Sequence, residues 1–446
     1  MGKHKSDVQI VFVSTSFPFL NFLFTNLKYF FLGVLLSIFV ITSFSCSPAV
    51  RKIEETKTRI SPKAYKIVRS EKNQIRVLLS DNQNPVSFKT NGTYKLISDN
   101  EEIGKLKKGD EWTFKINSGG VNTKFNNREV DGITFLFQPI DSESVILFSG
   151  KKYKGDFLVV YSDNNKIFVL NRLPMEDYLL GVLHPEMAVK STQTDRLEAL
   201  KAFAVCARTF AEMKVDKGNT YYDITDDVRD QVFDGCGNYT DLDQKAIAAT
   251  SGEILKFKER LAEVFYHSAC GGMLEDPANV FSGKVDEYLS SKKDGDEKAN
   301  CEISPTFSWK ESYTQAELLK LLKEKNLLTK KQKVVKDVVI SEVFDSGRAK
   351  EIQISFNAGD DVILKAIEVR NLFTRKETKG ILRSSLFTIT KEVVKGDLKK
   401  ITLNGKGSGH GVGLCQWGAM NLSSQGKSYN EILDFYFQGC TVGKIE

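Results

Sequence analysis

Apolar and polar residues alternate along short segments between Gln74 and Asn171, with Gly, Asn and Asp between the segments. Alternation with a period of two is typical of β-strands that bury one face, and the intervening residue types are common in turns. Asp163-Asn164-Asn165 separates two apolar runs and predicts a hairpin. We therefore expect residues 74–171 to form a β-rich accessory region.

The pattern changes to helical spacing after Arg172. A first helix is predicted over Glu176–Leu183, and His184-Pro185-Glu186-Met187 is expected to break it, because proline cannot donate a helical hydrogen bond. Glu186 then falls at an irregular break between two apolar-faced helices, where an acid is unusual without a function. The second helix is predicted from apolar positions that recur every three or four residues: Leu197, Leu200, Ala204, Ala207 and Ala211.

The rest of the chain mixes both patterns. Asp241–Thr250 and Thr314–Leu328 are predicted helices, and a short helix is expected around Val362–Leu372 among strands. Ile401–Leu414 is rich in glycine, and two short helices are predicted after it, at Cys415–Leu422 and Tyr429–Tyr436.

These patterns indicate an α+β protein, and the length of 446 residues suggests two or three domains. We expect residues 172–446 to form a mixed α/β core, with residues 305–400 as a mixed α/β insertion. Residues 47–73 are charged and low in large apolar side chains, which predicts a solvated tether. Residues 1–46 are expected to be an export signal or anchor region.

Tyr29–Ser45 is a continuous apolar stretch that follows Lys28 and precedes Cys46. A basic flank, an apolar run and small residues before a cleavage point describe an export signal. Cys46 resembles the lipidated cysteine of bacterial lipoproteins, although Ser43 stands where leucine is usual. A lipoprotein is favoured over a plain membrane anchor or a cleaved secretory signal. We thus expect an exported, membrane-anchored protein that faces the cell wall.

The formal net charge is +6 and comes from scattered lysines. This charge favours an anionic partner, such as a cell-wall polymer or an acidic lipid surface. No Lys/Arg block is interleaved with aromatic residues, so no nucleic acid is expected as a partner.

The chain has only four histidines, and His267 and His410 both lie beside glycines. Glycine lets the backbone approach a ligand closely, so both segments are candidates for a binding site; tight turns with incidental histidines are the alternative. Ser268 adjoins His267, but no G-x-S-x-G motif is present, which argues against a serine hydrolase.

Cys270 and Cys301 flank one irregular segment. A disulfide between them is possible in an exported protein and is the first hypothesis. A metal site would combine His267 and Cys270 with Cys301 or His410, and free buried thiols are the third alternative. Zinc sites need four good ligands and this set is incomplete, so no cofactor is expected, with zinc as the minor alternative.

Six segments occur in an order that resembles the stage II sporulation protein D / amidase-enhancer family. They are EDYLLGVLHPEM (Glu176–Met187), LEALKAFAVCARTF (Leu197–Phe210), DQVFDG (Asp230–Gly235), FYHSACGG (Phe265–Gly272), LRSSLF (Leu382–Phe387) and GKGSGHGVGLCQWGA (Gly405–Ala419).

The resemblance implies a peptidoglycan lytic transglycosylase with a saccharide-binding groove in its core. Such enzymes cut the β-1,4 bond between N-acetylmuramic acid and N-acetylglucosamine and leave a 1,6-anhydro end; the resemblance also implies glycan strands stripped of their peptides as substrate. The family's catalytic glutamate maps onto Glu186. The expected partners of the protein are then glycan strands, the membrane through the N-terminal lipid or apolar segment, and a cell-wall amidase.

The chemistry of glycoside cleavage agrees with one glutamate. An acid must protonate the leaving oxygen. A hydrolase needs a second carboxylate, whereas a lytic transglycosylase uses the substrate's own C6 hydroxyl as the nucleophile. An apolar setting raises the pKa of such an acid, and Leu183 and Met187 are expected to contribute to it.

By the same match, further residues are expected to line or support the groove: His267, Ser268, Gly271, Gly272, His410, Gln416, Arg208 and Gln231. The sequence departs from the family pattern at Asp230, where members with zinc carry a cysteine, so the resemblance implies no zinc. Cys270 stands where serine is common, as in variants that also have a cysteine like Cys301, which favours the disulfide. The alternative function is a wall-binding protein or amidase activator that does not cut.

Overall fold

The computed structural model describes residues 62–445, apart from residues 70, 218, 282–285 and 366. The apolar stretch Tyr29–Ser45, Cys46 and most of the expected tether lie outside the described residues, so what the sequence predicts for them stays a prediction. Within the described part, no helix is both long enough and apolar enough to cross a membrane.

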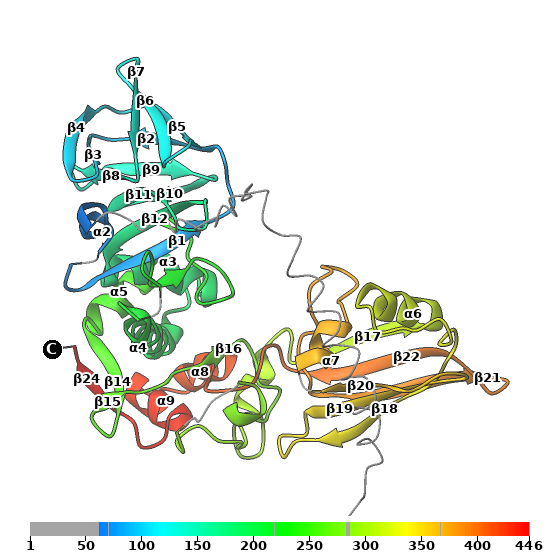
Figure 1. The fold of residues 1–446 in the computed structure, drawn as a ribbon. Helices are drawn as coiled ribbons and strands as arrows, with labels where there is room; N and C mark the ends of the chain where they lie inside the picture. Colours follow the sequence, from blue (N-terminus) through cyan, green and yellow to red (C-terminus); the bar gives the residue numbers. More distant parts are fainter. Residues whose placement is uncertain (1–61, 70, 218, 282–285, 366, 446) are drawn as a thin grey trace, which may run out of the picture. The chain divides into compact units, whose positions relative to one another are not determined.

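The β-rich region consists of two sheets (Figure 1). One has the strand order β13-β1-β12-β11-β8-β3-β4, and the other has the order β10-β9-β2-β5-β6-β7. The strands are β1 (Gln74–Ser80), β2 (Val86–Asn91), β3 (Tyr94–Ser98), β4 (Glu101–Leu106), β5 (Glu111–Ile116), β6 (Val121–Phe125), β7 (Arg128–Gly132), β8 (Thr134–Pro139), β9 (Val145–Phe148), β10 (Lys151–Tyr153), β11 (Asp156–Tyr161), β12 (Ile167–Pro174) and β13 (Ile224–Thr225).

Aromatic rings join the two sheets into one core. Phe88 of β2 lies 4.9 Å from Phe137 of β8, and Trp112 of β5 lies 5.3 Å from the same ring. Edge-to-face pairs of this kind add to the stabilisation from burial. The predicted hairpin is confirmed, since β11 and β12 pair in antiparallel register and Asn165 takes a left-handed conformation with φ 57°.

The expectation of a solvated tether over residues 47–73 was wrong for Pro62–Val68, because these residues form helix α2. Ile67 and Val68 are buried against the outer face of the first sheet, in a cluster with Leu78 and Leu158. Burial of two branched side chains on an existing sheet stabilises a helix that its short charged sequence does not predict.

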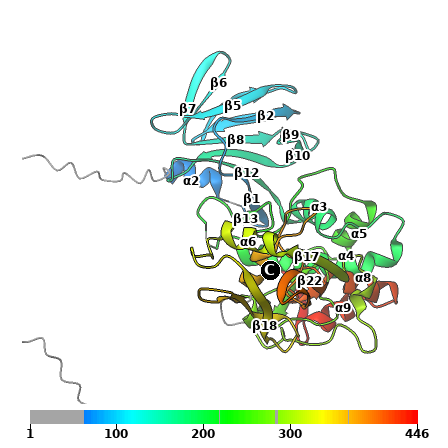
Figure 2. The same cartoon turned by 90° about the vertical axis from the view of Figure 1, so that its right-hand side faces the viewer.

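Five helices surround the candidate site: α3 (Met175–Glu186), α4 (Leu197–Lys214), α5 (Asp241–Ala249), α8 (Gln416–Ser424) and α9 (Tyr429–Tyr436). The predicted start of α4 at Leu197 is confirmed, and α4 packs against the other four helices (Figure 2). Its interior face is fully buried, as the small-residue spacing requires. Three short 3-10 turns also occur in this part: η1 (Thr194–Arg196), η2 (Pro277–Asn279) and η3 (Asn300–Ile303).

Short strands tie the helices to the glycine-rich loops. β14 (Glu253–Phe257) pairs with β15 (Arg260–Leu261) and with β24 (Thr441–Lys444). β16 is only Tyr266–His267, and it pairs in parallel with β23 (Leu414–Cys415). This pair aligns two motifs that lie almost 150 residues apart, with partners Tyr266↔Leu414 and His267↔Cys415.

A second hydrophobic core lies between Tyr313 and Leu403. Its elements are β17 (Ser308–Thr314), α6 (Gln315–Glu324), β18 (Val335–Val343), β19 (Ala349–Phe356), β20 (Val362–Lys365), α7 (Ile367–Leu372), β21 (Phe387–Val394) and β22 (Asp397–Lys406). The α+β class is thereby confirmed. The helix expected around Val362–Leu372 is a strand followed by a helix, while the limits 305–400 of the insertion stay a prediction.

Candidate active site

Helix α3 does not break where the sequence predicts, since it continues through Pro185 and ends at Glu186. Pro185 has no N–H, so the carbonyl of Gly181, four residues earlier, loses its helical donor. The backbone N–H of Asp234 takes that place at 3.0 Å. A loop from a later part of the chain therefore satisfies this carbonyl, which is why the proline is tolerated.

Gly181 permits this approach because it has no side chain. A Cβ at this position would lie 2.5 Å from the carbonyl oxygen of Gly235 and would collide with the ring of Phe233. The segment 232–235 therefore packs directly on the last turns of α3, and it places the N–H of Val232 beside the Glu186 carboxylate.

The Glu186 carboxyl is half-buried and accepts a hydrogen bond from Val232 N at 2.9 Å. Burial raises its pKa, because the charged form loses hydration. The Val232 N–H and the side chains of Tyr266 and Gln416 oppose this shift, since they favour the carboxylate. The negative end of the α3 dipole disfavours the charge as well. The net result is a carboxyl that holds its proton to a higher pH than an exposed glutamate.

Gln231 anchors the segment 232–235 to helix α3. Its side chain is fully buried, and its Oε1 accepts a hydrogen bond from the Tyr178 hydroxyl at 3.0 Å. Its Nε2 has no hydrogen-bond partner among the residues that the structure describes. Tyr178 belongs to α3, so Gln231 fixes the loop to the same helix that carries Glu186.

The two glycine-rich motifs lie next to each other. Besides the β16–β23 pair, Ala269 and Ser408 exchange backbone hydrogen bonds at 2.9 and 2.7 Å. Trp417 N donates to the Ser268 carbonyl at 3.1 Å. These contacts place the start of α8, and with it Gln416, beside the strand that carries Tyr266 and His267. The structure thus brings Glu186, Gln231, His267, Ser268, His410 and Gln416 into one region.

Both histidines of the site are neutral. The Nδ1–H of His267 donates to the Val412 carbonyl at 3.0 Å, and burial lowers its pKa to about 4. Its Nε2 is therefore an acceptor, and it has no partner in the described part of the chain. His410 accepts from Val412 N at its own Nδ1, and burial together with the nearby His267 lowers its pKa. The two rings lie 5.4 Å apart.

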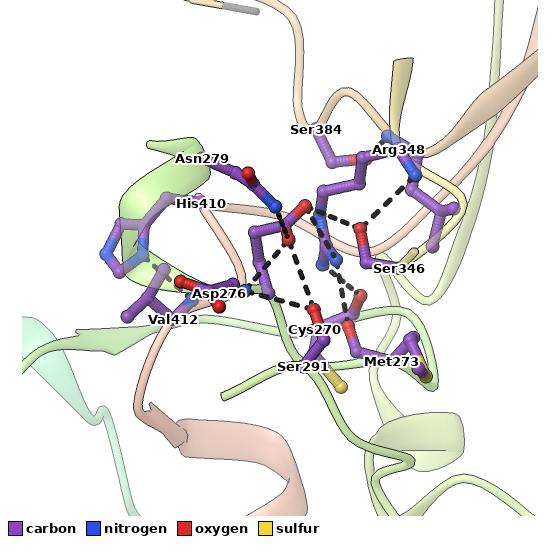
Figure 3. Close-up of polar contacts among 12 residues, drawn as sticks. Cys270, Met273, Asp276, Asn279, Ser291, Ser346, Arg348, Ser384, His410 and Val412 are labelled. Carbon is purple, nitrogen blue, oxygen red and sulfur yellow. Dashed lines mark hydrogen bonds and ion pairs between the residues drawn. The ribbon is translucent and has the colours of Figure 1, made fainter. Parts of the chain in front are cut away.

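A buried Arg–Glu network supports the loop that carries His410. Arg348 donates to the carbonyls of Met273 and Cys270, at 3.0 and 2.8 Å (Figure 3). Its Nη1 lies 4.0 Å from Glu275, whose backbone N–H donates to the Gly411 carbonyl. Gly411 must lack a side chain, because a Cβ there would meet the Arg348 guanidinium.

Gly271 and Gly272 allow the tight turn and close packing of the backbone after β16, and no contact between them and Glu186 is seen among the described residues. Both have positive φ, and a Cβ on Gly271 would lie 2.9 Å from Lys406. Gly272 N donates to the sulfur of Cys270. Their expected contact with a saccharide stays a prediction.

Arg208 does not lie beside Glu186. It is fully buried and forms a bidentate ion pair with Glu176 in the first turn of α3. Its Nε lies 3.0 Å from Oε1 of Glu176, and its Nη2 lies 2.6 Å from Oε2. Glu176 precedes Glu186 by ten residues, which corresponds to about 15 Å along a helix. The pair therefore fixes α4 to α3 at the opposite end from Glu186.

Cys270 and Cys301 lie side by side as free thiols, with their sulfurs 3.4 Å apart. That separation exceeds the S–S bond of about 2.05 Å, and the disulfide stays a prediction. Two further groups lie at the same place, Asp294 and Cys415. No sequence pattern pointed to Asp294, which lies in an irregular polar segment. Tyr266 and Cys415 were also missed, although each lies within one of the quoted motif segments.

Comparison with known proteins places these residues in context. A family model described as stage II sporulation protein matches residues 163–257, and a domain of unknown function matches residues 273–413. An uncharacterised protein of Brachyspira hyodysenteriae is 30 % identical over 83 % of this chain and 93 % of its own length. The amidase enhancer of Bacillus subtilis is 30 % identical over 76 % of this chain, which spans 50 % of that protein. Stage II sporulation protein D of Bacillus subtilis is 26 % identical over 62 % of the chain and 76 % of its own length.

Proposed function

Because the chain belongs to the stage II sporulation protein (SpoIID) family, we propose that it acts on the bacterial cell wall as a peptidoglycan lytic transglycosylase. The observation that carries the proposal is Glu186, a half-buried carboxyl with a raised pKa at the meeting point of the family motifs. Its substrate would be the glycan strand, with or without stem peptides.

The reaction needs one group that first gives and then takes a proton. Protonated Glu186 donates to the glycosidic oxygen, and the bond from C1 of the muramic residue to that oxygen breaks. The C6 hydroxyl of the same sugar attacks C1, a new C1–O6 bond forms, and the hydroxyl proton returns to Glu186. Atoms balance without water, and the carboxyl is regenerated.

The surroundings of Glu186 suit both halves of this cycle. Burial keeps a protonated fraction at higher pH, as a general acid requires. The Val232 N–H and the side chains of Tyr266 and Gln416 stabilise the carboxylate formed after proton transfer. The free Nε2 of His267 offers a buried hydrogen-bond acceptor for a sugar hydroxyl.

The proposed substrate lies outside the cytoplasmic membrane, which fits an exported protein anchored through Cys46. A second candidate function is activation of a cell-wall amidase without cleavage, which the similarity to an amidase enhancer favours.

The test uses purified protein with peptide-free glycan strands and, separately, intact sacculi, with the products identified by mass spectrometry. We expect 1,6-anhydro ends from the wild type and none from Glu186→Gln. Glu212→Gln is the matched control, because Glu212 is also half-buried with a pKa raised by burial but lies outside the site. Unchanged ends in Glu186→Gln contradict the proposal. Stimulation of an added amidase by both proteins, without new glycan ends, favours the second function.

A further inference from the structure

Three thiols and one carboxylate converge beneath the two glycine-rich motifs. The sulfurs of Cys270, Cys301 and Cys415 and a carboxylate oxygen of Asp294 all lie within 4.8 Å of one another. All four residues are fully buried. They come from four separate places: the turn after β16, the loop before η3, η3 itself and the residue that caps α8.

We propose that these four residues bind a thiophilic divalent metal ion, with Zn²⁺ as the best fit, in a structural site. Three thiolates and a carboxylate make four ligands, the number that closed tetrahedral zinc sites use. Thiolates favour zinc over magnesium or calcium, which prefer oxygen ligands. The proposal does not depend on the chemistry of Glu186.

The spacing of the donor atoms suits a tetrahedral centre. Zinc–sulfur distances of ~2.3 Å correspond to sulfurs about 3.8 Å apart. Cys270 and Cys301 are 3.4 Å apart, and Cys270 lies 3.0 Å from Oδ2 of Asp294. Small side-chain rotations therefore suffice to surround an ion.

Asp294 is the observation that a disulfide leaves unexplained. A Cys270–Cys301 bond would leave a buried carboxylate and the Cys415 thiol together, and no basic side chain among the described residues forms an ion pair with Asp294. A buried carboxylate without a cation is costly. A metal ion supplies that cation and uses all four groups.

Outer contacts hold the ligands as a metal site requires. The Tyr436 hydroxyl donates to Oδ1 of Asp294 at 2.8 Å, which leaves Oδ2 toward the sulfurs. Gly418 makes this possible, because a Cβ there would collide with that hydroxyl. Backbone N–H groups of Cys270 and Gly272 donate to the sulfurs of Cys415 and Cys270, each at 3.3 Å.

Positive charge around the cluster offsets its thiolates. Cys415 caps α8, whose N-terminal end carries partial positive charge. The buried guanidinium of Arg348 donates to the Cys270 carbonyl (Figure 3). The site described here differs from the one considered from the sequence, because Asp294 and Cys415 take the places of His267 and His410.

The test is metal analysis of the full chain purified without reducing agent or chelator. We expect about one zinc per chain, release of protons on binding, and sulfur-to-metal charge-transfer absorption when Co²⁺ replaces zinc. A chelator is expected to remove the metal and lower the melting temperature. A metal-free wild type with Cys270 joined to Cys301, read from the intact mass under non-reducing conditions, overturns the proposal.

Variants separate a built site from adventitious metal. Cys415→Ala and Cys301→Ala are each expected to lower zinc affinity by at least 100-fold, whereas Cys206→Ala, an equally buried cysteine in α4, retains it. Asp294→Asn keeps the side-chain shape and is expected to weaken binding if the chain folds. Equal zinc affinity in Cys415→Ala and the wild type contradicts the proposal, because Cys415 is one of the four proposed ligands.

Discussion

Glu186 and Asp294 are two acids whose pKa values burial raises, yet their surroundings suit different tasks. Glu186 is half-buried and takes its hydrogen bond from a backbone N–H. Asp294 is fully buried, its pKa is raised to about 7, and it accepts hydrogen bonds from the Cys270 thiol, the backbone N–H of Cys301 and the Tyr436 hydroxyl. A raised pKa alone thus does not identify a proton donor, because a closed site admits no substrate.

The difference lies in what the neighbours can do. Around Glu186, amide and hydroxyl groups stabilise the charge and can exchange partners with a sugar. Around Asp294, the neighbouring thiols are themselves proposed metal ligands. We therefore expect changes at Glu186 to affect catalysis and changes at Asp294 to affect stability, and the two sets of variants can be compared directly.

The largest effect is expected for Glu186→Gln. General acid catalysis contributes ~10²- to 10⁴-fold, so the rate of anhydro-end formation should fall by about that factor. The melting temperature should change little, since a glutamine oxygen also accepts from Val232 N. Product mass spectrometry and thermal unfolding measure the two effects. A large loss of stability with unchanged activity per folded molecule would mean that Glu186 has a structural role and not a catalytic one.

Asp294→Asn should show the opposite pattern. Zinc affinity is expected to fall by about 100-fold or more, with a lower melting temperature, because outer-shell changes alone cost 10- to 100-fold. Folded molecules of this variant should keep glycan cleavage within a few fold at saturating zinc. Isothermal titration with zinc and unfolding with and without chelator measure the effect; a selective loss of cleavage would make Asp294 part of the catalytic site.

Gly181→Ala tests the contact that positions Glu186. Alanine usually stabilises a helix interior by up to 1 kcal/mol relative to glycine. Here the added Cβ meets Phe233 and the Gly235 carbonyl, so we expect a loss of about 1–3 kcal/mol and a lower rate. Gly119→Ala is the control, because nothing lies within 4 Å of its Cβ. Urea unfolding of both variants gives the difference, and equal stabilities would contradict the packing argument.

The smallest effect is a shift of the pH profile in Gln416→Met. Gln416 lowers the pKa of Glu186, so its removal should raise that pKa further. Glu186 must be protonated to act, and kcat/KM is therefore lost as pH rises through its pKa. The decline should move to higher pH in Gln416→Met and in Tyr266→Phe, measured as kcat/KM against pH. A shift to lower pH would mean that neither side chain stabilises the carboxylate.

Local pattern predicted much of this molecule. The hairpin at Asn165 and the start of α4 at Leu197 follow from turn chemistry and helical spacing. The end of α3 could not be predicted, because the donor that replaces the missing proline N–H comes from Asp234, far along the chain. Helix α2 was missed for a similar reason, since it depends on the sheet beneath it.

For the candidate site, the motif resemblance singled out Glu186, His267 and His410, which the fold brings into one region, whereas Arg208 pairs with Glu176 at the other end of α3. No local sequence pattern points to Asp294, because it becomes a candidate ligand only when the fold brings three cysteines from other segments next to it. Convergence of this kind depends on tertiary structure, and spacing along one segment cannot reveal it.

The proline in α3 also restricts how positions 181, 185 and 234 can vary. Any other residue at 185 would bring an N–H that competes with Asp234 for the carbonyl of Gly181. The helix would then gain a hydrogen bond and the loop would lose one, and the loop would be free to shift away from the carboxyl of Glu186. Proline has no N–H and so removes that competition. A helix with a regular hydrogen bond at position 185 would therefore hold Glu186 in place less well than the helix with proline.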